Sequence, residues 1–181
     1  MSGAGDPTVI PARVTVKGLA RALDRPVPEV QGVLRARDLP DAPEDLLDVA
    51  TVLAVAGLLG ITVMIEPRDL ALEVLYEYEV RGEVDADLEG RAAEIVSGVI
   101  RDLDELDRLI ESVSEHWSVA RMPLLDRNIL RIGVFELRGE KVPTPVVVAE
   151  AVRLAQTYST EKSAAFVNGV LATLAKTIRD G

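Results

Sequence analysis

Two absences restrict the chemistry available to this chain. The sequence of 181 residues contains no cysteine and a single histidine, His116. Without thiols, the chain cannot form disulfides, thiolate zinc sites, iron–sulfur clusters or a cysteine nucleophile, and one imidazole leaves almost no material for a multi-histidine metal site or a serine–histidine triad. His116 lies beside Trp117, where we expect a packed, hydrogen-bonded side chain. We therefore predict no catalytic residue, no metal and no cofactor, and we do not expect an enzyme.

Positive charge is also scarce. The chain has 20 Lys and Arg against 30 Asp and Glu, which gives a formal net charge of −10. This balance disfavours nonspecific attraction of nucleic acid by a global basic field, although a local basic patch is still compatible with it. The acidity is concentrated in residues 67–112, with 5 basic and 14 acidic residues, whereas residues 113–181 carry 9 basic and 7 acidic residues. The C-terminal part is therefore mildly basic.

Signals for export or membrane insertion are weak. The N-terminus, MSGAGDPTVIPARV, has neither a basic segment nor an apolar run, so we predict no signal peptide and expect a cytoplasmic protein. The charge-free run Val49–Ile65 reaches the lower limit of a membrane-spanning helix, about 17 residues. However, Gly57 and Gly60 interrupt it, β-branched residues follow, and its flanks are acidic. This pattern favours a buried helix followed by a short strand, with no membrane contact.

The first part of the chain, residues 13–66, is predicted to form a small α/β module. Its turns are marked by prolines, and Pro28 suits the first turn of a helix because its missing N–H would be unpaired there anyway. The expected elements are a strand at Val14–Val16, helices at Lys17–Leu23, from Pro28 to near Arg37 and at Glu44–Leu59, and a strand in the segment ITVMI.

The rest of the chain, residues 67–181, is predicted to be a helical bundle, so that the fold class is mainly α. Apolar residues recur at steps of three and four from Leu88 to Val113, which indicates one long amphipathic helix. Ser159 or Ser163 is the expected N-cap of the last helix. Five helices are expected, at Arg68–Val80, Leu88–Val113, Leu124–Leu137, Val146–Tyr158 and about Phe166–Ile178.

One acidic segment has the opening pattern of a calcium loop. Its oxygen ligands at positions one, three and five and its glycine at position six are Asp85, Asp87, Glu89 and Gly90. The carboxylate required at position twelve is replaced by Val96, which cannot bind a cation. We therefore interpret this segment as an acidic connection between helices.

Two further spacings each have a functional and a structural interpretation. Ser159 and Lys162 match a Ser-x-x-Lys pair, but the companion motifs of that catalytic class are absent, so a helix cap with an exposed lysine is favoured. Arg127, Arg131 and Arg138 share one face of a helix. They are placed either to contact phosphate or to form salt bridges with the acidic long helix, and the spacing alone leaves both open.

Three segments in order, LLDRNILRIGVFEL, VVVAEAVRLA and KSAAFVNGVL, resemble the C-terminal half of the NusB family of transcription antitermination factors. The segment LALEVLYEYEVRG resembles the first helix of that family, so the resemblance covers residues 68–179. It implies an all-helical, non-catalytic domain that binds the boxA element of nascent ribosomal RNA together with the ribosomal protein NusE. Other Nus factors and RNA polymerase are further partners implied by the same resemblance.

The resemblance also assigns individual positions. It places Asp126 and Tyr76 on the side that contacts NusE, and Lys162 and Phe166 in the loop and helix start near RNA. Asp126 itself is expected to be the N-cap of its helix, where a carboxylate is favourable. In the family, an arginine-rich run before and within the first helix grips RNA phosphates. Here that stretch is MIEPRDLALEV, in which Arg68 alone is basic.

The N-terminal module has a resemblance of its own. VTVKGLARALDRPVPEVQGVLRARD, followed by a helix and GITVMIE, resembles the small N-terminal module of bacterial translation initiation factor two. Its cations are expected either to form a replacement basic face for RNA or only to keep a small domain in solution. They are Lys17, Arg21, Arg25, Arg35 and Arg37.

Two functions from different classes follow from these patterns. The first is an antitermination factor, acting on ribosomal RNA with NusE, whose RNA contact has moved partly to the appended module. The second is a protein-interaction scaffold of the same fold that has lost boxA binding, which the missing arginine run favours. A detached RNA-binding domain of a ribosomal RNA methyltransferase has less support, because no cofactor-binding domain follows in this sequence.

Overall fold

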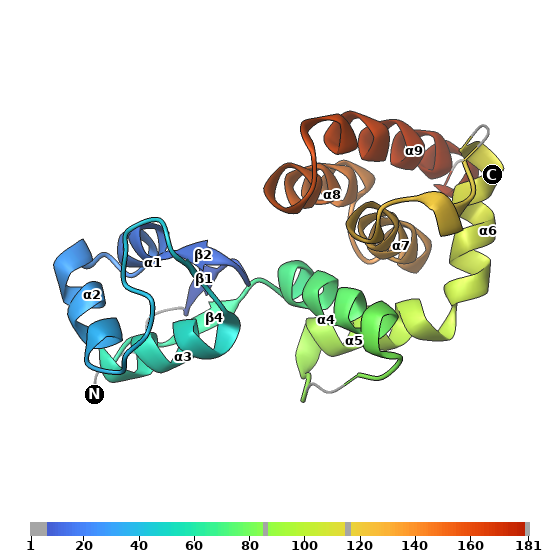
Figure 1. Cartoon of the computed structure of the whole chain (residues 1–181). Helices are drawn as coiled ribbons and strands as arrows, with labels where there is room; N and C mark the ends of the chain where they lie inside the picture. The colour runs from blue at the N-terminus through green and yellow to red at the C-terminus, as the bar shows by residue number, and fades with distance from the viewer. Residues whose placement is uncertain (1–6, 85–86, 115–116, 180–181) are drawn as a thin grey trace. The chain divides into compact units, whose positions relative to one another are not determined.

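The computed structural model describes residues 7–84, 87–114 and 117–179. The chain divides into two compact units, Met1–Leu70 and Ala71–Gly181. In its described residues the N-terminal unit combines three helices with four short strands. The C-terminal unit is helical in all of its described regular structure (Figure 1). The predicted fold class, mainly α with a small α/β module, is confirmed.

Two small sheets organise the N-terminal unit. β1 (Thr8–Ile10) pairs in parallel with β4 (Val63–Ile65), and β2 (Val14–Thr15) pairs antiparallel with β3 (Leu46–Leu47). Neither β1 nor β3 was expected from the sequence. Each is held by pairing with a strand far along the chain, β4 and β2 respectively. β1 also lies before residue 13, so the module starts earlier than predicted.

The three helices of this unit are α1 (Val16–Ala22), α2 (Val27–Arg35) and α3 (Val49–Leu58). The predicted helix start at Glu44 is wrong: Leu46 and Leu47 pair with β2, and Asp48 caps α3 by accepting a hydrogen bond from the Thr51 N–H at 2.7 Å. This hydrogen bond lowers the pKa of Asp48. Among the described residues, no helix combines the length and apolarity needed to cross a membrane.

The core of the N-terminal unit collects apolar side chains from all of its helices and from β1, β3 and β4. Fully buried large side chains there include Ile10, Leu19 and Leu34. The charge-free sequence of α3 is explained only in part by this core, since Leu53 and Leu58 are about half exposed.

The helices of the C-terminal unit are α4 (Pro67–Arg81), α5 (Gly90–Arg101), α6 (Leu103–Val113), α7 (Leu124–Gly139), α8 (Thr144–Tyr158) and α9 (Glu161–Arg179), with a 3-10 turn, η1, at Val119–Arg121. The single helix predicted over Leu88–Val113 is therefore two helices, broken at Asp102. The apolar periodicity missed the break because Leu103 and Leu106 keep the three-to-four spacing across it.

α7 is the central helix of this unit and packs against α5, α6, α8 and α9 (Figure 1). Ten of its residues are buried, including the polar Asp126, Asn128, Arg131 and Glu136. Gly98 on α5 lies so close to the ring of Phe135 on α7 that a side chain there would displace it, and Gly133 is pressed in the same way against Leu171 on α9. At its other end, hydrogen bonds from Ser159 and Ser163 to Asp126 hold α7 beside the turn between α8 and α9.

Candidate functional site

The turn between α8 and α9 carries two residues predicted to lie near RNA. Lys162, in the first turn of α9, is exposed, and Phe166, one turn later, is half-buried. The prediction that Ser159 or Ser163 is the N-cap of α9 is wrong. The N-cap is Thr160, whose Oγ1 accepts a hydrogen bond from the Ser163 N–H at 3.3 Å. Three hydroxyl residues within five positions, Ser159, Thr160 and Ser163, made the choice ambiguous in the sequence, and only the observed helix start resolves it.

Asp126 is tied to this turn from α7. The Ser159 hydroxyl donates to its Oδ1 at 2.5 Å, and the Ser163 hydroxyl donates to its Oδ2 at 2.9 Å. The residue is 5% exposed. The prediction that Asp126 caps α7 is wrong, because α7 begins at Leu124, after Pro123, and Asp126 is its third residue. With both oxygens occupied inside the protein, the arrangement does not favour the expected direct contact with a partner.

Tyr76 and Arg68 occupy different environments on α4. Tyr76 is 40% exposed, so its ring is available to a partner. The Arg68 side chain is 16% exposed and its guanidinium lies 3.4 Å from Glu66 Oε1. Glu66 Oε2 also accepts from the backbone N–H groups of Arg68 and Asp69. The one cation left at the position of the family's arginine run is therefore engaged with a neighbouring carboxylate.

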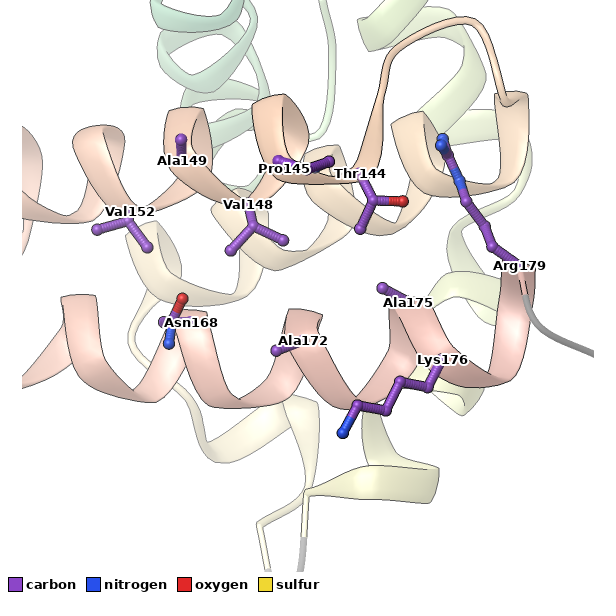
Figure 2. Close-up of a pocket in the computed structure, with 10 residues that line it drawn as sticks. All are labelled: Thr144, Pro145, Val148, Ala149, Val152, Asn168, Ala172, Ala175, Lys176 and Arg179. Carbon is purple, nitrogen blue, oxygen red and sulfur yellow. The ribbon is translucent and has the colours of Figure 1, made fainter.

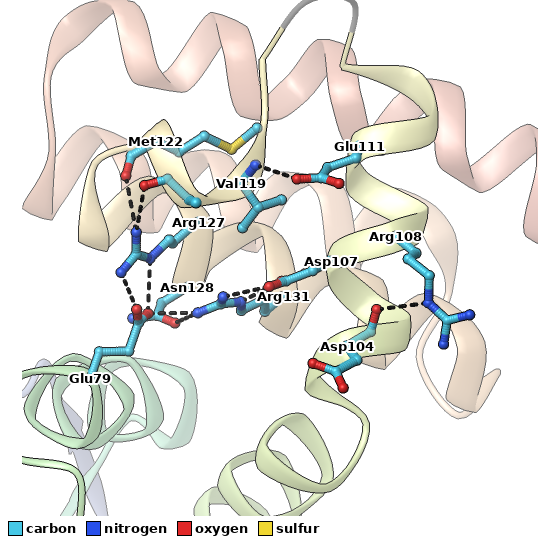
Figure 3. A network of polar contacts seen from close by, with 11 residues as sticks. Glu79, Asp104, Asp107, Arg108, Glu111, Val119, Met122, Arg127, Asn128 and Arg131 are labelled. Atoms are coloured by element: carbon cyan, nitrogen blue, oxygen red, sulfur yellow. Dashed lines mark hydrogen bonds and ion pairs between the residues drawn. The ribbon is translucent and has the colours of Figure 1, made fainter.

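The arginines of α7 are held by carboxylates on two other helices (Figure 3). Arg131 donates to Asp107 of α6 at 2.7 and 2.8 Å and to Glu79 of α4 at 2.6 Å. Arg127 donates to both oxygens of Glu79. Arg138, near the other end of α7, lies 3.1 Å from Glu105. The predicted salt bridges to the long acidic segment are therefore correct for Arg131 and Arg138, whereas Arg127 pairs with Glu79 of α4 instead. None of the three is presented as a free phosphate ligand.

Glu79 is the shared acceptor of this network, and sequence reasoning missed it. Burial alone would raise its pKa, but hydrogen bonding from Arg127 and the charges of Arg131 and Arg127 outweigh burial and lower it. Burial likewise works against the charge of Arg131, while the bonds to Asp107 and Glu79 raise its pKa. Glu79 is one of many acids in an acidic stretch, so no pattern in the sequence separates it from its neighbours.

The cations of the N-terminal unit are more accessible. Lys17 and Arg21 are four residues apart on α1 and both are exposed. Arg25 follows the end of α1 and lies 4.0 Å from Glu29. Arg35 bonds to Asp41 at 2.5 Å. Of the predicted basic face, Lys17 and Arg21 are thus the pair that one helix surface brings together.

The remaining motifs add no site within the part of the chain that the structure describes. Asp85 of the calcium-like segment lies outside the described residues, as does His116, and the described part of the chain contains no group of three metal-binding side chains. The Ser159 hydroxyl of the Ser-x-x-Lys pair is hydrogen-bonded to Asp126.

An open apolar groove of about 660 Å³ lies between α8 and α9 (Figure 2). Val148 and Val152 of α8 and Ala172 of α9 form part of its walls. Arg179 lies at one end, where its guanidinium donates to backbone carbonyls, among them that of Val142 at 2.7 Å. This arginine therefore fixes the chain that enters α8.

The model of the NusB family matches residues 65–176. The chain belongs to the NusB family. The transcription antitermination protein NusB of Clavibacter michiganensis is 44% identical over 128 residues, covering 61% of this chain and 93% of the relative. That of Acidothermus cellulolyticus is 46% identical over 118 residues, covering 58% and 81%.

Solved structures agree with this membership. T. maritima NusB is 33% identical, with a TM-score of 0.54, over 61% of this chain and 88% of that chain. A crystal structure of the antitermination factors NusB and NusE in complex with double-stranded RNA contains a chain that is 33% identical, with a TM-score of 0.53, over 61% of this chain and 94% of that chain. The NusB region thus accounts for the C-terminal unit, and the resemblance of the N-terminal unit to the initiation-factor module stays a prediction.

Proposed function

We propose that this chain is a transcription antitermination factor that binds boxA-like RNA together with NusE and acts by binding, without catalysis. The observation that carries the proposal is the similarity, at 33% identity, to the NusB chain of a NusB–NusE–RNA complex. The relatives named as transcription antitermination proteins, matched over most of their own length, support the same function.

The RNA contact is proposed to be weak in the chain alone. Arg68 is paired with Glu66, so the region of the family's arginine run offers RNA little free positive charge. Each phosphate contact to a single strand contributes about 0.7 to the slope of log affinity against log salt, so losing about three contacts removes about 2 units. Lys162, Phe166, Lys17 and Arg21 are the proposed RNA contacts that remain. Tyr76 is the proposed contact with NusE.

The test is a boxA RNA titration of the whole chain with and without NusE. We expect weak binding alone and markedly tighter binding in the presence of NusE. Lys162→Asp should weaken the RNA complex several-fold while leaving thermal unfolding unchanged, because an acid is tolerated in the first turn of a helix. Lys176→Asp, at the other end of α9, is the charge-matched control. Equal effects of the two substitutions would remove Lys162 from the RNA surface.

A second candidate is a protein-interaction scaffold of the NusB family that does not bind boxA RNA. The pairing of Arg68 with Glu66 and of the α7 arginines with carboxylates favours it. It predicts normal NusE binding and no RNA binding at any salt concentration, so the same titration separates the two functions.

A further inference from the structure

The buried carboxylate of Asp126 lies under the turn that carries Lys162. Asp126 is on α7, 33 residues before Ser159 in the sequence, and its two oxygens bind the hydroxyls on either side of that lysine. From this geometry we infer that Asp126 is a positioning residue for RNA binding, which holds the Ser159–Ser163 turn so that Lys162 faces the phosphates. The inference rests on the proposed function.

The direction of the hydrogen bonds explains why a carboxylate is needed. Ser159 and Ser163 both donate their hydroxyl protons to Asp126. Since the Ser163 proton is used in this way, the contact of 2.8 Å between Ser163 Oγ and Thr160 Oγ1 is donated by Thr160. A carboxylate accepts from both hydroxyls at once, whereas an amide of the same shape presents one acceptor and one donor, so one hydroxyl would have to turn round and accept, which changes its bonds within the turn.

The turn is short, and hydrogen bonds within it join Ser159, Thr160 and Ser163 to one another, whereas Asp126 ties it to a different helix. α8 ends at Tyr158 and α9 begins at Glu161, so Ser159 and Thr160 alone connect them. Ser163 is buried, whereas Lys162 is exposed immediately beside it. A shift of the backbone at Ser159 or Ser163 therefore moves Lys162 directly. A displaced cation loses its phosphate contact without any loss of charge from the protein.

The experiment measures RNA affinity and its salt dependence for the NusE-saturated complex, with NusE affinity measured separately by calorimetry. Asp126→Asn and Ser163→Ala should each weaken RNA binding about five- to tenfold and reduce the salt slope by about 0.7, as if one phosphate contact were lost. NusE affinity should change less than twofold. Ser97→Ala is the control, because that hydroxyl bonds only to carbonyls of its own helix, α5.

A double-mutant cycle separates positioning from general destabilisation. In a Lys162→Met background, Asp126→Asn should weaken RNA binding by less than a further twofold, because the contact it positions is already gone. A full five- to tenfold loss in that background would overturn the inference, as would weaker NusE binding with unchanged RNA affinity. If the wild-type complex itself does not bind RNA, the proposed function is overturned as well. That outcome is distinct from failure of the inference alone, because it is seen before any substitution is made.

Discussion

In the C-terminal unit the arginines of α7 are enclosed by carboxylates of neighbouring helices, whereas in the N-terminal unit Lys17 and Arg21 of α1 are exposed to solvent. Arg131 is an extreme case, with a side chain 6% exposed between Glu79 and Asp107. The comparison shows that a basic residue in the sequence does not by itself indicate a positive charge that a ligand can reach. A cation serves recognition only where the fold leaves it without an internal partner.

This difference also bears on the two units' stability. Ion pairs between α4, α6 and α7 join helices that are distant in the sequence, so their loss affects the packing of the whole bundle. The N-terminal unit is held mainly by its apolar core, and its described ion pairs, such as Arg25 with Glu29, are local and largely exposed. Exposed ion pairs of this kind contribute little to the free energy of unfolding.

The largest expected effect comes from breaking the enclosed network. Arg131→Met should lower the free energy of unfolding of the C-terminal unit by about 3 kcal/mol, because it leaves the buried side-chain oxygen of Asn128 and the partly buried carboxylate of Asp107 without their partner. Urea unfolding followed by circular dichroism measures it. Arg81→Met, at an exposed pair with Glu77 on α4, is the control and should leave unfolding unchanged. Equal effects would contradict the distinction between enclosed and exposed arginines.

A smaller effect is expected from pH. The pKa of Glu79 is lowered in the folded state, so its contribution to stability is complete above the unfolded pKa, about 4.3, and is lost as the pH falls through the folded pKa. The stability difference between wild type and Glu79→Gln should therefore be largest near pH 7 and shrink on acidification below about pH 4. Urea unfolding at a series of pH values measures this difference. A difference that stays constant with pH would show that Glu79 acts by shape alone.

The smallest effect is expected at the exposed cations of the N-terminal unit. Lys17→Ala with Arg21→Ala should reduce the salt slope of RNA binding by about 1 to 1.5 and leave the stability of the unit unchanged. Arg25→Ala is the matched control, because Arg25 lies against Glu29 and off the surface of α1. Fluorescence anisotropy of labelled boxA RNA at several salt concentrations tests this prediction. If the salt slope of RNA binding is unaltered in the double variant, Lys17 and Arg21 do not contact RNA and serve only to keep the domain in solution.

Sequence reasoning succeeded where one helix or one motif carried the information. The apolar stripes predicted α7, α8 and α9 to within a few residues, and the motifs around Asn128 and Phe166 indicated the family that the comparison then showed. It failed at α3, because the sequence predicts a helix start at Glu44 where Leu46 and Leu47 form a strand. Leu46 and Leu47 are held in the strand by pairing with Thr15 and Val14 across the sheet, and two leucines beside an apolar run suit a helix equally well.

The sequence alone determined that no thiol chemistry is available, that residues 67–181 are mainly helical, and which family three motifs resemble. Only the tertiary structure decided what the charged residues do. It placed Glu79 between Arg127 and Arg131, and it buried Asp126 under the hydroxyls of Ser159 and Ser163. The physical reason is that a charge acquires its role from the groups packed around it, and those groups come from helices 33 to 52 residues away in the chain.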